Sequence, residues 1–185
     1  VLRALARGAN WVDAVYYSLQ ALSWQEVAIG DPLYRPFAVS LDEQLKNVAQ
    51  LPAELASYPI LRRMRELDAA KRPAEAVALA VSAQHDAPSL AVGLALAQHL
   101  RDAGDSEGAA NALGFAPLIK SLRADEWELM RETAQLLEAC GRPTRALEVW
   151  RVLFAVKALP AEVRAAWLKD ALKTAVAVRD AAQTA

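Results

Sequence analysis

Three stretches of the chain share one ten-residue pattern, and this pattern decides the fold. The stretches are Leu67-Asp-Ala-Ala-Lys71-Arg-Pro-Ala-Glu-Ala76, Leu100-Arg-Asp-Ala-Gly104-Asp-Ser-Glu-Gly-Ala109 and Leu137-Glu-Ala-Cys-Gly141-Arg-Pro-Thr-Arg-Ala146. They align without gaps, with leucine first, alanine or cysteine fourth, glycine or lysine fifth and alanine tenth. Their spacing of 33 and 37 residues indicates an internal structural repeat.

The pattern predicts the turn of a helical hairpin. We expect the leucine to end the first helix on its buried face and the small fourth residue to lie where two helices come close. The fifth position suits a helix C-terminus, which favours glycine. The tenth-position alanine would let the second helix pack closely on the first. Because the spacing brackets the roughly 34 residues of a tetratricopeptide repeat, the fold class predicted is mainly α, with tetratricopeptide-like hairpins in a stack.

Residues around the pattern agree with this prediction. Ala97 and Ala134 lie three residues before their leucines, and Trp150 lies four residues after its tenth-position alanine. Pro88 stands where such repeats often carry proline. The repeats are degenerate, because the usual first-helix tryptophan and glycine are absent and Gly114 interrupts the second helix of the middle hairpin.

The first forty residues follow a different pattern. Asn10 can cap a helix over residues 11–22, and residues 25–29 are a strand candidate that ends at Gly30. The following Gly-Asp-Pro sequence is typical of a turn. We therefore expect residues 1–40 to be the C-terminal end of a truncated α/β domain. The start at Val1, without methionine and within a helix-like stretch, indicates a fragment.

Capping residues divide the rest of the chain. Ser40 and Glu43 form a capping box that starts a helix over residues 41–50, within a connecting helix and linker at 41–57. The helical repeat domain is expected at 58–185. Its groove would be lined by the first helix of each hairpin, at 59–70, 89–102 and 125–139.

A last helix, opened by a proline at position 160 and running over residues 161–178, should close the stack. We expect one of its faces to pack on the preceding hairpin. That face carries Val163, Trp167, Ala171, Leu172 and Ala175.

Composition narrows the functional classes. Hydrophobic residues make up 55% of the chain and charged residues 23%, with a formal net charge of −1. Acids and bases alternate without a basic stripe, which argues against a nucleic-acid partner. No apolar run reaches the roughly 18 residues of a membrane-spanning helix. The chain has one cysteine, so an intrachain disulfide is excluded.

Residues 16–37, YYSLQALSWQEVAIGDPLYRPF, carry a resemblance. The runs LSWQ and GDPLYRPF resemble the C-terminal signature of an uncharacterised bacterial family, found in species with the exosortase protein-sorting system. The resemblance covers about residues 10–40, and the body of that family would lie upstream of this chain. It implies a bacterial source and points to the cell envelope or an extracytoplasmic compartment, although the sequence itself leaves localisation unknown.

The same segment is more loosely similar to gingipain-type, caspase-like cysteine peptidases. Their α/β domain also ends with a helix, a strand and a Gly-Asp-Pro turn. Those enzymes use a Cys/His pair earlier in the domain, and nothing in this chain matches that pair. The resemblance therefore assigns no catalytic residue here.

Each candidate site residue has a structural interpretation that we prefer. Asp31 and Arg35 could pair beside a cleft, but a turn that satisfies its own backbone donors is the expected role. Cys140 could be a nucleophile, but it occupies a position filled by alanine in the other repeats and is expected in the core. His85 and His99 lack the further ligands of a metal site.

Two other groups have the same ambiguity. Trp127, Trp150 and Trp167 could form an aromatic patch that binds peptides, but their spacing fits the repeat core better. A cluster of three arginines could form a basic face, but nearby acids predict a solvated helix surface. The members of this cluster are Arg62, Arg63 and Arg65.

The sequence therefore predicts a non-catalytic module for protein–protein interaction or scaffolding. We expect no catalytic residue, no cofactor and no metal ligand in the chain. The partner would be a protein or peptide, or the missing N-terminal domain. The alternative is that the chain is the C-terminal appendage of a caspase-like hydrolase whose catalytic domain lies upstream.

Overall fold

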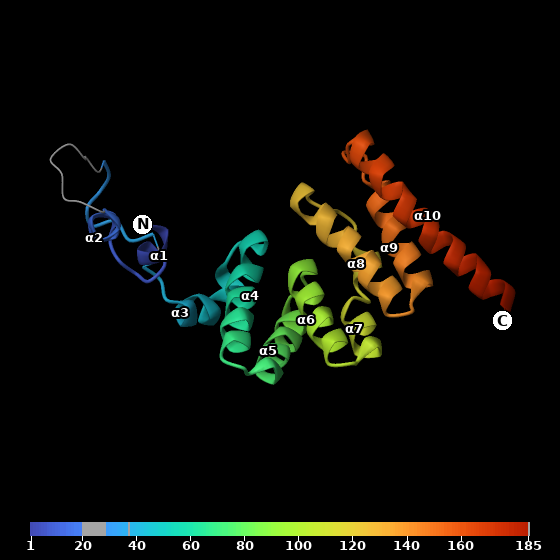
Figure 1. Cartoon of the computed structure of the whole chain (residues 1–185), viewed down its shortest axis with the longest axis horizontal. Coiled ribbons are helices and arrows are strands. Elements are labelled where there is room, and N and C mark those ends of the chain that lie inside the picture. The colour runs from blue at the N-terminus through green and yellow to red at the C-terminus, as the bar shows by residue number, and fades with distance from the viewer. Residues whose placement is uncertain (20–28, 37, 185) are drawn as a thin grey trace. The chain divides into compact units, whose positions relative to one another are not determined.

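A computed structural model describes residues 1–19, 29–36 and 38–184. The described residues form ten α-helices and short 3₁₀ turns, with no strand among them (Figure 1). The predicted mainly α fold is confirmed. The predicted strand at 25–29 lies, apart from Ile29, outside the described residues. The helix expected at 11–22 ends earlier, at Ser18, with Leu19 in an extended conformation, and residues 20–22 lie outside the described residues.

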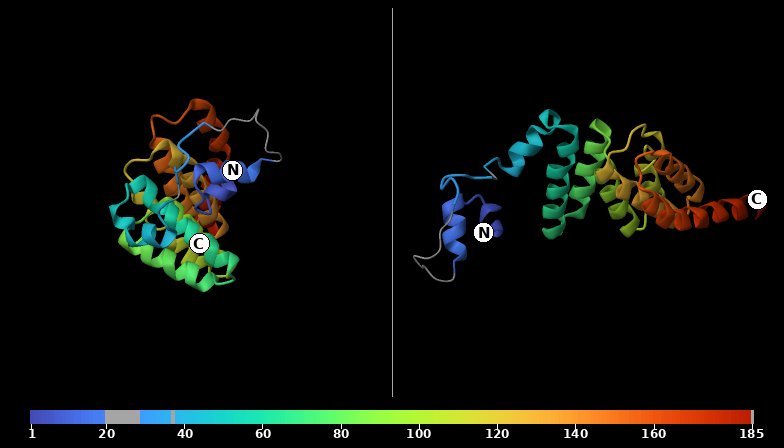
Figure 2. Two further views of the ribbon diagram at one scale, coloured as in Figure 1. Left: turned by 90° about the vertical axis from the view of Figure 1, so that its left-hand side faces the viewer. Right: turned by 90° about the horizontal axis from the view of Figure 1, so that it is seen from above.

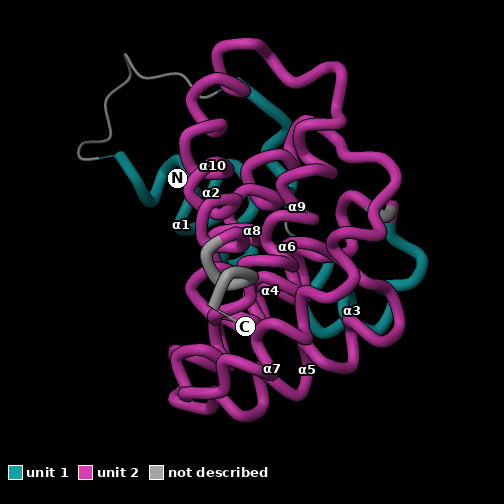
Figure 3. Tube along the Cα trace, turned by 90° about the vertical axis from the view of Figure 1, so that its right-hand side faces the viewer, with its two compact units in different colours: residues 1–51 teal, residues 52–185 magenta. Residues whose placement is uncertain are grey.

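The chain divides into two compact units, Val1–Leu51 and Pro52–Ala185 (Figure 3). Unit 1 contains α1 (Leu2–Leu5), α2 (Trp11–Ser18), α3 (Leu41–Lys46) and the 3₁₀ turn η1 (Val48–Gln50). The helix expected over 41–50 is thus an α-helix that tightens into a 3₁₀ turn.

Asn10 and Ser40 are the N-caps of α2 and α3, as predicted, and of the capping box expected at Ser40 and Glu43 the structure gives the bond to the Ser40 hydroxyl. The Asn10 side chain accepts a hydrogen bond from the Asp13 amide at 2.8 Å, and the Ser40 hydroxyl accepts one from the Glu43 amide at 3.2 Å. Side-chain oxygens of this kind satisfy the free amides of a first helical turn. The start of α2 is further fixed because the Trp11 amide donates to a backbone carbonyl oxygen at residue 34.

Unit 2 is a stack of helical hairpins (Figures 1 and 2). The hairpins pair α4 (Ala53–Ala69) with α5 (Pro73–Asp86), α6 (Leu90–Asp102) with α7 (Ser106–Ala112), and α8 (Trp127–Ala139) with α9 (Pro143–Ala155). Helix α10 (Ala161–Thr184) packs on α9. The repeat domain was expected to begin at residue 58. Helix α4 begins earlier, at Ala53, and continues through a proline at position 59.

The three aligned stretches form the same helix end. The fifth-position residues Lys71, Gly104 and Gly141 have left-handed φ angles of 59°, 87° and 71°. In each turn the next amide donates to the carbonyl of the first-position leucine, at 2.8, 2.8 and 2.9 Å. This six-to-one hydrogen bond defines the Schellman motif that commonly ends helices. The predicted helix C-terminus at the fifth position is confirmed three times.

The tenth-position alanines are fully buried in the hairpins. Ala76, Ala109 and Ala146 are each 0% exposed, which confirms their predicted role. The fourth-position prediction is wrong for Ala70 and Ala103, which are exposed. These two residues are the C-caps of α4 and α6, and the left-handed residue that follows turns the chain outward there.

The core is densest between α8 and α9. Trp150 is 1% exposed and stacks on Phe154 with ring centroids 5.6 Å apart. Trp127 and Trp167 are half-buried against the same cluster. The three tryptophans therefore have the core role predicted for them, and burying rings of this size contributes strongly to stability.

Helix α10 closes the stack with the predicted face, except at one position. Ala171 is buried and Val163, Trp167 and Ala175 are half-buried, as expected, but Leu172 is 56% exposed. The buried position belongs to Thr174, whose hydroxyl donates to Glu138 Oε2 at 2.8 Å. That hydrogen bond removes the penalty of burying a hydroxyl, so the helix can present threonine to α8 and leave a leucine outside.

Candidate functional site

The middle hairpin is interrupted, and the candidate site arises from this interruption. Its second helix, α7, has only 7 residues and ends at Ala112, whereas α9, the second helix of the third hairpin, has 13 residues. Gly114 and Pro117 follow, and both residues disfavour a helix interior. The chain instead makes the 3₁₀ turns η2 (Ala116–Leu118) and η3 (Ala124–Glu126) before α8 begins. We call residues 113–126 the connector.

The connector is anchored at two points and exposed between and after them. Leu113 and Ala116 are both 0% exposed, so their side chains belong to the core. Phe115 is half-buried, and Leu118 is 76% exposed. These two anchors hold the connector on the core and leave the side chains of Phe115 and Leu118 partly or largely exposed beside them.

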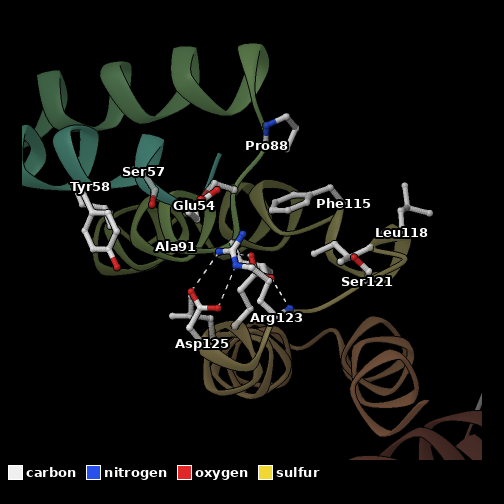
Figure 4. A pocket seen from close by; sticks show the side chains of 16 residues that line it. Glu54, Ser57, Tyr58, Pro88, Ala91, Phe115, Leu118, Ser121, Arg123 and Asp125 are labelled. Carbon is white, nitrogen blue, oxygen red and sulfur yellow. Dashed lines mark hydrogen bonds and ion pairs between the residues drawn. The ribbon is translucent and has the colours of Figure 1, made fainter. Parts of the chain in front are cut away.

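These side chains form one wall of a groove with a volume of about 590 Å³. The other walls come from the N-terminal turns of α4, α6 and α8. The part of the groove used below consists of Glu54, Tyr58, Phe115, Leu118, Arg123 and Asp125 (Figure 4). The groove volume lies within the range of about 300–1,000 Å³ that ligand pockets have.

The guanidinium of Arg123 lies in the middle of this groove (Figure 4). Its Nε donates to Asp125 Oδ1 at 3.1 Å, and its Nη2 is 3.1 Å from Glu126 Oε1. Glu126 Oε2 also accepts a hydrogen bond from the Arg123 amide at 3.0 Å, which fixes the start of η3. The connector thus holds its own charged residues in place.

These contacts change the pKa of both partners. The hydrogen bond to Asp125, with the negative charges of Glu126, Asp125 and Glu54, holds the pKa of the Arg123 guanidinium above its usual range. The same hydrogen bond holds the pKa of the Asp125 carboxyl below its usual range. Both groups are therefore charged across the physiological pH range.

The groove agrees only in part with the groove predicted from sequence. The first helices of the three hairpins line it as expected, through α4, α6 and α8. The connector residues Phe115, Leu118 and Arg123 were not predicted. A usable signal was present in the sequence, because residues 115–122 place several apolar side chains after a helix-breaking glycine.

The turn residues singled out in unit 1 have a structural role. Asp31 Oδ1 accepts a hydrogen bond from the Leu33 amide at 2.9 Å, and the Asp31 carbonyl accepts one from the Tyr34 amide at 3.1 Å. Arg35 is exposed. The turn satisfies its own backbone donors, as the structural interpretation predicted.

The other candidates lie apart from the groove. Cys140 is half-buried at the C-cap of α8 and packs against the core cluster. His85 is exposed at the end of α5. His99 lies on α6, where its two ring nitrogens contact the Ala95 carbonyl at 2.9 Å and the Asp68 carboxylate at 2.9 Å. Within the described ranges, no group of three potential metal ligands is found.

The arginines of α4 form a solvated surface, as predicted. Arg62 Nε lies 3.5 Å from Glu66 Oε1, and Arg63 Nη1 lies 3.4 Å from Glu66 Oε2. Exposed pairs of this kind contribute little to stability. No helix in the described part of the chain combines the length and the apolar character needed to cross a bilayer.

No protein-family model, curated protein or solved structure shows significant similarity to this chain. The function must therefore be argued from the residues of the chain and their arrangement.

Proposed function

We propose that unit 2 is a tetratricopeptide-like interaction module that binds a segment of a protein partner in the groove. The repeated helix end and the buried tenth-position alanines support the repeat assignment. Stacked hairpins of this type present their first helices on one side, where extended ligands can bind. The groove lies at the first helices of all three hairpins.

The exposure of apolar side chains in a concave surface carries the proposal. Tyr58 is 64% exposed and Leu118 is 76% exposed, and both line the groove with Phe115. Exposed apolar side chains that gather in one depression mark binding sites, whereas isolated ones need no explanation. A bound segment would cover these side chains and gain the free energy of burying them.

A binding role also suits the charged residues of the groove. Arg123, Asp125 and Glu126 are already engaged with one another, and the contact to Glu126 fixes the connector. Such an arrangement positions a surface, because the Arg123 charge is compensated within the connector. It supports recognition better than proton transfer.

The proposal can be tested with a peptide library displayed on phage and selected against the full chain. We expect peptides to be enriched and to bind the wild-type protein in calorimetry. Tyr58→Ala and Leu118→Ser should each weaken a selected peptide about tenfold or more, as for anchor residues of an interface. Both residues are exposed, so the fold should remain unchanged.

The matched control is Val81→Ser, which removes another half-exposed aliphatic side chain, on α5 and outside the groove. This variant should bind like the wild type. The proposed function is wrong if no peptide is enriched. It is also wrong if the Tyr58 and Leu118 variants bind the selected peptides as tightly as the control does.

The idea of an upstream caspase-like hydrolase stays a prediction that rests on the resemblance of residues 16–37. A Cys/His pair encoded upstream at suitable strand ends would support it. For the chain itself we predict no peptide hydrolysis. Peptide turnover that disappears in Cys140→Ala would contradict that prediction.

A further inference from the structure

We propose that the segment bound in the groove is basic and apolar, with a lysine or arginine side chain next to an aliphatic or aromatic one. This inference rests on the proposed function and specifies the chemistry of the partner. It follows from the net charge of the residues that line the groove, from a carboxylate whose oxygens can accept further hydrogen bonds, and from the position of the aromatic rings.

The groove carries excess negative charge. Its charged lining residues are three carboxylates, Glu54, Asp125 and Glu126, and one guanidinium, Arg123, so their formal sum is −2. The net charge of the whole chain is −1, so the residues outside the groove sum to +1 and the negative charge of the chain is concentrated in this small surface. Complementary charge across an interface favours the matching partner and disfavours like-charged competitors.

Glu54 is the carboxylate most open to a ligand. It is exposed on the first turn of α4 and forms no hydrogen bond or ion pair with any other described residue. In Figure 4 its carboxylate and that of Asp125 are seen on either side of the Arg123 guanidinium. The guanidinium forms its hydrogen bonds and ion pair with Asp125 and Glu126 and attracts Glu54 only at longer range, so the Glu54 oxygens can accept hydrogen bonds from a cation of a ligand.

The aromatic rings provide a second contact for a cation. Tyr58 and Phe115 both line the groove, from α4 and from the connector. A lysine or arginine head group over such a ring gains about 0.5–1 kcal/mol at an exposed site. Leu118, beside Phe115, would receive the apolar neighbour of that cation. An acidic segment would meet the carboxylates and gain neither contact.

Three synthetic peptides test the inference. All have the same length and the same leucine and tyrosine content, and they differ in carrying two lysines, two glutamines or two glutamates. Calorimetry with the full chain at low salt should give the tightest binding for the lysine peptide and the weakest for the glutamate peptide. Added salt should reduce this difference, because it screens exposed charges.

Glu54→Gln should weaken the lysine peptide about fivefold, as expected for loss of one exposed ion pair, and leave the glutamine peptide unchanged. Glu162→Gln removes an exposed carboxylate from the first turn of α10, outside the groove, and should leave all affinities unchanged. Glu54→Lys should bring the formal charge of the lining to 0 and abolish the preference for the lysine peptide.

The possible failures separate the two proposals. If peptides selected from the library bind in the groove but the lysine, glutamine and glutamate peptides bind equally, the charge inference is wrong and the proposed function stands. Tightest binding of the glutamate peptide also overturns the inference. If neither the library nor the three peptides bind, the proposed function itself fails.

Discussion

The middle and third hairpins begin alike and end differently. Both have the same Schellman turn and a fully buried tenth-position alanine. Beyond that alanine, α9 continues as a regular helix, whereas α7 stops and the connector begins. The buried register nevertheless persists. Leu113 and Ala116 are 0% exposed, and they stand four and seven residues after their alanine, as Trp150 and Leu153 do in α9.

The difference shows how a degenerate repeat can gain a binding surface without losing its core. The connector keeps the two core positions, but it fills them with smaller side chains than α9 does. Its remaining residues are released from helical geometry. The groove can therefore be lined by Phe115, Leu118 and Arg123. In the third hairpin a regular helix occupies the corresponding part of the chain.

The largest expected effect tests whether the two core positions are equivalent. Trp150→Ala should lower the free energy of unfolding by about 3–5 kcal/mol, because it empties a fully buried site. Leu113→Ala should lower it by about 2–5 kcal/mol. Urea denaturation followed by circular dichroism measures both. Val81→Ala, at an exposed position on α5, should change it by less than about 0.5 kcal/mol.

A loss below about 1 kcal/mol for Leu113→Ala would mean that the connector is not held by the core. The conclusion that buried positions continue at the same spacing into the connector would then be wrong. The interpretation of the regular third hairpin would not be affected.

The second prediction tests the part that the two hairpins share. Ala109→Trp and Ala146→Trp should each lower the free energy of unfolding by about 1–3 kcal/mol, because a large ring cannot fit at a fully buried alanine. Ala78→Trp, at an exposed position on α5, is the matched control and should have little effect. Equal stability of all three variants would contradict the repeat register.

The third prediction concerns the helix that faces the connector. Gly93 is buried in α6, and a Cβ atom there would clash with Gln84 Nε2 and lie 3.0 Å from the Phe115 ring. Gln84 Oε1 accepts a hydrogen bond from the Ser89 amide at 2.6 Å, so its amide group cannot move without losing that contact.

Alanine normally stabilises a helix relative to glycine by about 1 kcal/mol. We expect Gly93→Ala to lower the free energy of unfolding by about 1 kcal/mol instead, because crowding outweighs propensity. Gln84→Ala combined with Gly93→Ala should recover part of the loss. A stabilised Gly93→Ala variant in thermal denaturation would show that the connector packs loosely on α6.

The hairpins were predictable because their signals are local. A left-handed residue is needed at the helix end; glycine fills this position in two repeats, and Lys71 adopts the same conformation in the first. An alanine at closest approach is equally recognisable. Both signals recur at a regular spacing, so three weak indications reinforce one another.

The groove was not predictable in the same way. It depends on how the single irregular segment after Gly114 folds back, and no second copy of that segment exists in the chain for comparison. One position of α10 was missed for a related reason. A polarity pattern places Leu172 inside, whereas the structure buries Thr174, whose hydrogen bond to Glu138 is not visible from α10 alone.

The smallest expected effect concerns the contact between the first two hairpins, whose contribution to stability should depend on pH. Asp68, the second residue of the pattern, contacts His99 Nε2 on the next first helix, as Glu138 contacts Thr174 further along. Partial burial lowers the pKa of His99, but hydrogen bonds to Asp68 and to the Ala95 carbonyl and the nearby negative charges outweigh it, so the pKa is raised.

A raised pKa in the folded state means that the folded protein binds the proton more tightly than the unfolded chain does. The contact should therefore contribute fully below the pKa of an unfolded histidine, about 6.5, and lose its contribution as the pH rises through the higher folded value. NMR titration of His99 should show the raised pKa. Urea denaturation from about pH 5 to 8 should show a loss of stability that Asp68→Asn and His99→Gln both remove. Glu132→Gln, an exposed carboxylate change on α8, should preserve the loss. If the wild-type protein and His99→Gln depend on pH in the same way, the contact does not couple these two hairpins.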